Sequence, residues 1–337
     1  MKSNFEFLKE DFPVLANFGE LAEKYCYSDS NSCLMKLGMM GETIANLIFT
    51  YDKISFPNDN TAVNRVNTLL REGLITQDLA DILHALRKKR NLAAHENYGS
   101  VDDSIALLQM AYSLCEWFMQ TYGDWSYQNV AFVMPVPQAE APVKNVQAES
   151  EEEDRLIKEA EEAASEAPAI SIEERKKQAG KAASQRQRPE VETRYLIDEQ
   201  LRKVGWEVDT VNLRYSKGTR PTKGHNMAIA EWPTDSTVGN RGSADYALFV
   251  DTQMVAIIEA KAIHKDIPSV IDYQCKDYSR NIRKEDVEYQ IGIWGKYKIP
   301  FTFATNGRPY LEQLDTKSGI WFLDLREASN APTNCVL

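Results

Sequence analysis

The chain has 337 residues, of which 43% are hydrophobic and 26% charged, and its formal net charge is −11 at pH 7. This composition is typical of a soluble globular protein of about two domains, and the overall acidity argues against a protein that coats nucleic acid. No apolar run approaches the roughly 20 residues of a membrane helix, and the N-terminus lacks the apolar core of a signal peptide. The five cysteines form no C-x-x-C pair, which favours free thiols over disulfides or a zinc ribbon. We therefore expect a cytoplasmic protein with no membrane partner.

Hydrophobic pattern and composition divide the chain into regions. Residues 1–135 carry apolar residues at helical spacing, which predicts four or five helices packed as a bundle. Residues 136–188 are rich in Ala, Glu, Lys, Pro and Gln, which predicts a charged linker that is flexible or partly helical. Residues 189–330 are expected to form an α/β domain, and residues 331–337 a tail. The predicted fold class is therefore multidomain, with a helical bundle followed by an α/β domain.

The expected elements of the α/β domain alternate between helices and strands. A helix is predicted over 191–206, strands over 243–250 and 254–262, a second helix over 269–282, and strands over 297–307 and 319–325. Two adjacent strands followed by a helix and further strands are typical of a mixed central sheet.

Three charged residues occur in the two adjacent predicted strands, ADYALFV and MVAIIEAKA. Glu259 and Lys261 are two residues apart, so their side chains point to the same side of a strand, and pairing of the strands would bring Asp245 near Glu259. Two close carboxylates repel unless a cation joins them, and Mg²⁺ prefers carboxylate oxygens. A neighbouring lysine can orient a metal-bound water or stabilise negative charge on a phosphate. This constellation suits phosphodiester hydrolysis; the structural alternative is a Lys–Glu pair at a sheet edge.

The motifs around these residues resemble the PD-(D/E)xK nuclease core. More narrowly, they resemble the N-terminal nuclease domain of type I restriction enzyme R subunits. The resemblance covers roughly residues 189–330 and rests on the leading helix VETRYLIDEQLRKVGW, the segments RGSADYALFV, IIEAKA and FATNG, and the Q-x-x-x-Y pattern in QCKDYSR. Ala244 stands where the general family has proline, whereas an R-x-A-D-Y form is what we expect in R subunits.

The resemblance implies a Mg²⁺ site with assigned roles. Asp245 and Glu259 would be metal ligands, the carbonyl group of Ala260 would complete the site, and Lys261 would be catalytic. Glu192, in the leading helix, matches a family carboxylate that binds or lies near the metal. The alternative for Glu192 is a solvated acid in the first turn of the helix.

Further residues are expected beside this site. Gln274 and Tyr278 are four residues apart on one helical face, and the resemblance places them with the catalytic residues, in contact with DNA or supporting the lysine. Ordinary helix packing is the alternative for Tyr278. The loop LRYSKGTRPTKGH is basic and is either a phosphate-contacting segment or a merely solvated one. Its candidate DNA-contacting residues are Arg214, Lys217, Arg220 and Lys223.

The same resemblance implies a substrate and partners. The substrate would be foreign, unmethylated double-stranded DNA, and the partners would be the specificity and methylation subunits of a restriction-modification complex. Type I R subunits also carry an ATP-driven motor, but no GxxxxGK[S/T] phosphate-binding loop occurs here. We therefore expect ATP to be a cofactor only of a motor outside these residues, and the chain to be either a piece of a longer protein or a stand-alone nuclease.

A second motif lies in the helical region. The stretch RKKRNLAAHEN contains Arg90, Asn91 and His95 and resembles the R-x4-6-H motif of HEPN domains, over roughly residues 15–125. That resemblance implies an alternative function, a metal-independent, toxin-like ribonuclease in which histidine acts as acid or base. A third alternative is a non-catalytic module for DNA binding or assembly.

Overall fold

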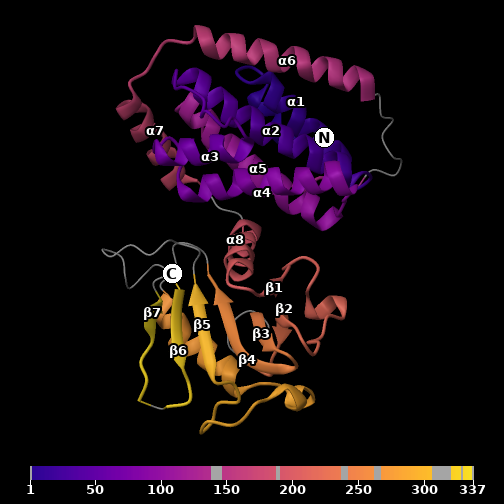
Figure 1. Cartoon of the computed structure of the whole chain (residues 1–337), viewed down its shortest axis with the longest axis vertical. Coiled ribbons are helices and arrows are strands. Elements are labelled where there is room, and N and C mark those ends of the chain that lie inside the picture. The colour runs from indigo at the N-terminus through magenta and orange to yellow at the C-terminus, as the bar shows by residue number, and fades with distance from the viewer. Residues whose placement is uncertain are drawn as a thin grey trace. The chain divides into compact units, whose positions relative to one another are not determined.

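The structure is a computed structural model that describes residues 2–137, 146–186, 190–236, 242–261, 267–305, 320–327 and 329–335. The chain divides into a helical unit, Met1–Pro189, and a sheet unit, Glu190–Leu337 (Figure 1). The predicted order, helices followed by an α/β domain with a mixed sheet, is confirmed. Among the described residues, no helix is both long and apolar enough to cross a membrane.

The helical unit is built on long helices whose ends are closed by polar caps. The side chains of Asp29, Thr61 and Ser100 accept hydrogen bonds from backbone amides in the first turns of α2, α3 and α5. Aromatic residues such as Trp117 and Phe118 are fully buried. Its elements are η1 (Asn4–Leu8), α1 (Pro13–Tyr25), α2 (Ser30–Tyr51), α3 (Ala62–Arg71), α4 (Gln77–Glu96), α5 (Val101–Tyr122), α6 (Val146–Glu166) and α7 (Ile172–Gln185).

The segment 136–188 differs from the predicted linker. In its described part it forms α6, which runs alongside α1 and α2 (Figure 1), and α7, which packs against α5. Arg175, Ala179 and Ala182 form the buried face of α7, and Arg186, its extended C-cap residue, is buried as well. The physical reason for the difference is that two of these buried residues are arginines, whose charges are paired inside the bundle.

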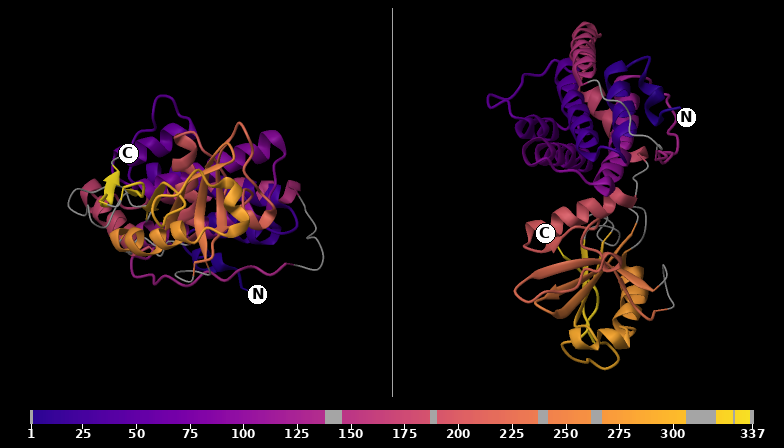
Figure 2. Two further views of the ribbon diagram at one scale, coloured as in Figure 1. Left: turned by 90° about the horizontal axis from the view of Figure 1, so that it is seen from below. Right: turned by 90° about the vertical axis from the view of Figure 1, so that its right-hand side faces the viewer.

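The sheet unit contains one mixed sheet with strand order β1-β2-β3-β4-β5-β6-β7. β1 pairs with β2 and β4 with β5 in parallel, and the remaining neighbours are antiparallel. The strands splay with the twist usual for a sheet (Figure 2). The strands are β1 (Glu207–Val208), β2 (Asn226–Pro233), β3 (Ser243–Val250), β4 (Gln253–Ala260), β5 (Phe301–Thr305), β6 (Ile320–Asp324) and β7 (Thr333–Cys335). The helical segments are α8 (Glu190–Lys203), η2 (Tyr215–Lys217), α9 (Ile267–Val270), the π-helix η3 (Ile271–Cys275), α10 (Lys276–Arg280) and η4 (Lys284–Tyr289).

Apolar clusters cover both faces of this sheet. Ile197 and Leu201 of α8 pack with Tyr246 and other residues of one face, while Tyr278 and Ile282 pack with residues of the other face. Strands β1, β2 and β7 were not predicted, and β7 occupies part of the predicted tail, 331–337, because it pairs with β6. The end of the predicted strand over 297–307, at residues 306–307, lies outside the described residues.

Candidate functional site

Asp245 and Glu259 lie at the same end of the antiparallel pair β3–β4. Tyr246 pairs with Ile258, so Asp245 and Glu259 are each one step beyond that pair and sit opposite one another. The backbone amide of Ala260 donates a hydrogen bond of 2.7 Å to Asp245 Oδ2. The expected approach of the two carboxylates is therefore seen.

Glu259 is buried and incompletely satisfied. Its side chain is 4% exposed, and Lys261 Nζ donates a hydrogen bond to Glu259 Oε1, as expected for two side chains on one side of a strand. The other oxygen, Oε2, is buried without a hydrogen-bond partner in the described part of the chain. Burial, followed by the charge of Asp245, raises the pKa of Glu259 to about 8 against the opposing effect of Lys261. Ionisation of Glu259 is therefore disfavoured in the folded chain unless a further positive charge binds beside it.

Gln274 and Tyr278 complete one side of this cluster. Gln274 Nε2 donates hydrogen bonds to Glu259 Oε1 at 2.5 Å and to Tyr278 Oη at 2.6 Å. Gln274 lies in the π-helical turn η3, and Tyr278 follows in α10. Turns of this kind are frequent at functional sites because they re-aim side chains. The Q-x-x-x-Y pair therefore lies beside the carboxylates, and Tyr278 also packs in the apolar core.

Arg194, Glu231 and Arg214 form an ion-pair cluster next to Asp245. Arg194 Nη1 is 2.9 Å from Glu231 Oε1, Arg194 Nη2 is 3.5 Å from Asp245 Oδ1, and Arg214 Nη2 pairs with Glu231 Oε1. Burial raises the pKa of Glu231, but the two arginines outweigh burial and hold it below its ordinary value. We did not predict roles for Arg194 and Glu231. A glutamate inside the apolar run AIAEWP was the available signal, the same one that marks Asp245 and Glu259.

The residues present fit a hard divalent cation held mainly by two carboxylates and water. Mg²⁺ commonly keeps several waters and takes one or two protein carboxylates, and the unpartnered Glu259 Oε2 is an oxygen without a protein donor. Among the described residues, no group of three or more His, Cys, Asp or Glu could hold a metal ion. Glu192 is fully buried on α8, but the structure does not join it to Asp245 and Glu259 in one ligand set.

The four basic residues of the predicted DNA-contacting loop differ in their surroundings. Arg214 is engaged by Glu231, and the guanidinium of Arg220 stacks 3.7 Å from the ring centroid of Tyr215. Lys217 and Lys223 are exposed. The stacked and paired arginines order part of this loop, and the side chain of Arg220 is exposed as well.

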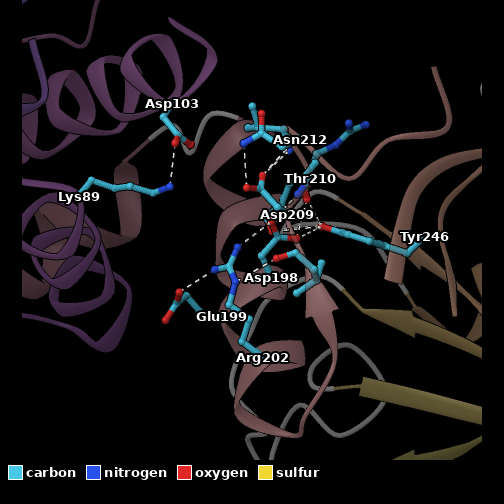
Figure 3. A network of polar contacts seen from close by, with 12 residues as sticks. Lys89, Asp103, Asp198, Glu199, Arg202, Asp209, Thr210, Asn212 and Tyr246 are labelled. Atoms are coloured by element: carbon cyan, nitrogen blue, oxygen red, sulfur yellow. Dashed lines mark hydrogen bonds and ion pairs between the residues drawn. The ribbon is translucent and has the colours of Figure 1, made fainter. Parts of the chain in front are cut away.

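A buried polar network fixes α8 against β3 and the segment after β1 (Figure 3). Asp198 accepts hydrogen bonds from the amide of Thr210 at 2.7 Å and from Tyr246 Oη at 2.9 Å. Burial raises the pKa of Asp198 despite these donors. Since Tyr246 adjoins Asp245, the network holds the start of β3 in place.

The residues of the alternative ribonuclease site lie on α4. Arg90 pairs with Glu42 at 2.9 Å, while Asn91 is partly buried and His95 is exposed in the last turn. No hydrogen bond joins Arg90 to His95 among the described side chains. The contact of Arg90 with Glu42 is one that helix packing alone would produce. The same holds for the nearby part-buried pair of Lys89 and Asp103 at 2.7 Å (Figure 3).

Comparisons with known proteins agree with the resemblance. A model of the type I restriction enzyme EcoKI endonuclease subunit second domain matches residues 207–336, and a domain of unknown function (DUF4145) matches residues 20–148. Over 98% of its length, the chain is 31% identical to the type I restriction enzyme EcoKI endonuclease subunit of Escherichia coli (strain K12), of which it spans only 34%. No solved structure matches the chain. The predicted relationship to type I restriction enzyme R subunits is confirmed.

Proposed function

We propose that this chain, a relative of type I restriction enzyme endonuclease subunits, carries a Mg²⁺-dependent endodeoxyribonuclease site in its sheet unit. The observation that supports it most is the convergence of Asp245, Glu259 and Lys261 at the ends of two paired strands, with Gln274 bonded to Glu259. The PD-(D/E)xK motif consists of two carboxylates followed by a lysine, and Asp245, Glu259 and Lys261 occur in that order along the chain. The site would hydrolyse phosphodiester bonds of DNA.

Each side chain has a role in this proposal. Asp245 and Glu259 would hold the Mg²⁺, with the carbonyl of Ala260 and the carboxylate of Glu192 as further candidate ligands; bound Mg²⁺ supplies charge stabilisation and a water of lowered pKa. Lys261, which now pairs with Glu259, would turn its ammonium toward the attacked phosphate and stabilise developing negative charge. Gln274 would orient Glu259, and Tyr278 would orient Gln274.

The biological setting is also proposed. The substrate would be foreign, unmethylated double-stranded DNA, selected by the specificity and methylation subunits of a restriction-modification complex and cut with the help of an ATP-driven motor. The candidate DNA contacts are Arg214, Lys217, Arg220 and Lys223. For the helical unit we propose a HEPN-like module that serves assembly or binding, on the resemblance carried by Arg90, Asn91 and His95.

The test is plasmid cleavage by the full chain in Mg²⁺ and in EDTA, in parallel with calorimetric binding of Mn²⁺ without DNA. We expect Lys261→Ala to lower cleavage at least about 100-fold, since it removes a charge that acts on the transition state. Asp245→Asn should abolish both cleavage and Mn²⁺ binding. Lys276→Ala is the matched control, because Lys276, the first residue of α10, is paired with the exposed Asp272 of η3, and it should leave both unchanged.

Two outcomes would contradict the proposal. One is Mn²⁺ binding that Asp245→Asn leaves unchanged, together with DNA cleavage that Lys261→Ala leaves unchanged. The other is cleavage of single-stranded RNA in EDTA that disappears in His95→Ala, which would make the helical unit the enzyme.

A further inference from the structure

Glu231 has an unusual backbone for its place in a strand. Its φ is 52° within β2, a left-handed conformation that is strained for a residue with a side chain. Its neighbours Ala230 and Trp232 pair with Tyr246 and Ala244, so Glu231 lies at the level of Asp245 on the next strand. The strain is kept at a position adjacent to the proposed metal ligands.

The carboxylate of Glu231 binds the guanidinium of Arg194. Arg194 lies between two carboxylates, 2.9 Å from Glu231 and 3.5 Å from Asp245, and so is held closer to Glu231. Arg214 reaches the same oxygen of Glu231 from a different segment. An arginine that closed fully on Asp245 would form a charge-assisted pair with the carboxylate that a divalent cation needs.

We propose that Glu231 is a positioning residue, which holds Arg194 back from Asp245 and so keeps that carboxylate available to a divalent cation. The inference rests on the proposed nuclease site and adds a residue to it. In this arrangement Arg194 offsets the repulsion among the neighbouring carboxylates before the cation arrives. Glu231 acts through Arg194, and Arg214 anchors Glu231.

The experiment measures Mn²⁺ binding to the full chain by calorimetry without DNA. Glu231→Gln removes the charge, and Glu231→Gly removes the side chain while tolerating the left-handed backbone. Both should weaken Mn²⁺ binding roughly tenfold, the effect of about one strengthened Arg–carboxylate pair. Adding Arg194→Gln to Glu231→Gln should restore the binding. Glu199→Gln is the matched control, because Glu199 pairs with Arg202 at 2.7 Å in the same unit.

The outcomes separate this inference from the proposed function. Wild-type Mn²⁺ affinity in both Glu231 variants would overturn the role of Glu231, and failure of the added Arg194→Gln to restore binding would overturn the role of Arg194. Both results leave the nuclease site intact if Asp245→Asn still abolishes binding. Binding that Asp245→Asn does not affect would overturn the nuclease proposal and this inference together.

Discussion

Each unit buries a carboxylate beside a basic side chain, but the two carboxylates differ in how many of their oxygens accept hydrogen bonds. In the helical unit, Asp52 accepts hydrogen bonds on both oxygens, from Arg175 Nε at 2.9 Å and from Tyr122 Oη at 2.8 Å. In the sheet unit, one oxygen of Glu259 meets Lys261 and Gln274 while the other is buried without a partner among the described residues. The first arrangement is complete without any ligand, and the second is not.

This difference separates a structural ion pair from a candidate binding site. A buried charge that is fully hydrogen-bonded lowers the free energy of the folded chain relative to an unpaired one, and nothing further is needed. A buried carboxylate with a free oxygen, a raised pKa and a second carboxylate nearby is costly unless a cation binds. The predictions below test this distinction.

The largest effect is expected from breaking the completed pair. Arg175→Met would leave Asp52 buried without its cation, and we expect the helical unit to lose about 3–5 kcal/mol of unfolding free energy. Equilibrium chemical denaturation measures this loss, and hydrogen exchange of the α7 amides locates it in the helical unit. Mn²⁺ binding by the sheet unit should be unchanged; a loss below about 1 kcal/mol would show that the pair is dispensable.

The incomplete site should respond to pH. Since burial and Asp245 raise the pKa of Glu259 to about 8 from 4.5, the folded sheet unit retains a proton that the unfolded chain releases between these values. Stability is therefore full below about pH 4.5 and falls as pH rises toward 8. Relative to Glu259→Gln, the metal-free wild type should lose about 2–4 kcal/mol over this range.

Mg²⁺ supplies the control for that measurement. It binds the ionised carboxylate, so saturating Mg²⁺ should remove most of the pH-dependent loss in the wild type and have no effect on Glu259→Gln. If the unfolding free energies of the metal-free wild type and of Glu259→Gln change with pH in the same way from pH 5 to 8, the raised pKa of Glu259 is contradicted.

The two sites also differ in what could be predicted from sequence. The strands that carry Asp245, Glu259 and Lys261 were predicted because their β-branched runs are local signals, and pairing of neighbouring strands then brings the charges together. Glu231 and Arg194 were missed because their contacts join α8 to β2 across 37 residues, and no local pattern encodes such a pair. The expected metal ligation still depends on the family resemblance.

In segment 136–188, composition alone gave the wrong expectation for buried charges. Composition predicted a linker, since Ala, Glu and Lys dominate and aromatics are lacking. Yet Arg175 lies on the buried face of α7 and Arg186 is buried at its C-cap, and a hydrophobicity pattern counts both as exposed residues. Their partners Asp52 and Asp78 lie far away in the sequence. Whether a charge is solvated or paired is therefore decided by tertiary contacts.

A smaller effect is expected at Tyr278, which is connected to Glu259 through Gln274. Tyr278→Phe removes the hydroxyl that accepts a hydrogen bond from Gln274 but keeps the ring in the core. We expect about 1 kcal/mol of destabilisation and a roughly tenfold drop in cleavage rate, because Gln274 would orient Glu259 less firmly. Cleavage assays as a function of Mg²⁺ should show a lower maximal rate with little change in the Mg²⁺ requirement. An unchanged maximal rate would contradict a positioning role.

The smallest effect is expected on the exposed face of α6. Arg155 bonds to Glu152 and to Glu159, as Arg175 bonds to Asp52, but the Arg155 side chain is 53% exposed and that of Arg175 only 5%. Water solvates the charges of Arg155 and its partners when the pairs break, so Arg155→Met should leave the midpoint of thermal unfolding nearly unchanged. Thermal unfolding beside Arg175→Met checks this directly. Similar losses in the two variants would mean that burial does not decide the value of these pairs, and the distinction between the completed and incomplete sites would then lose its physical basis.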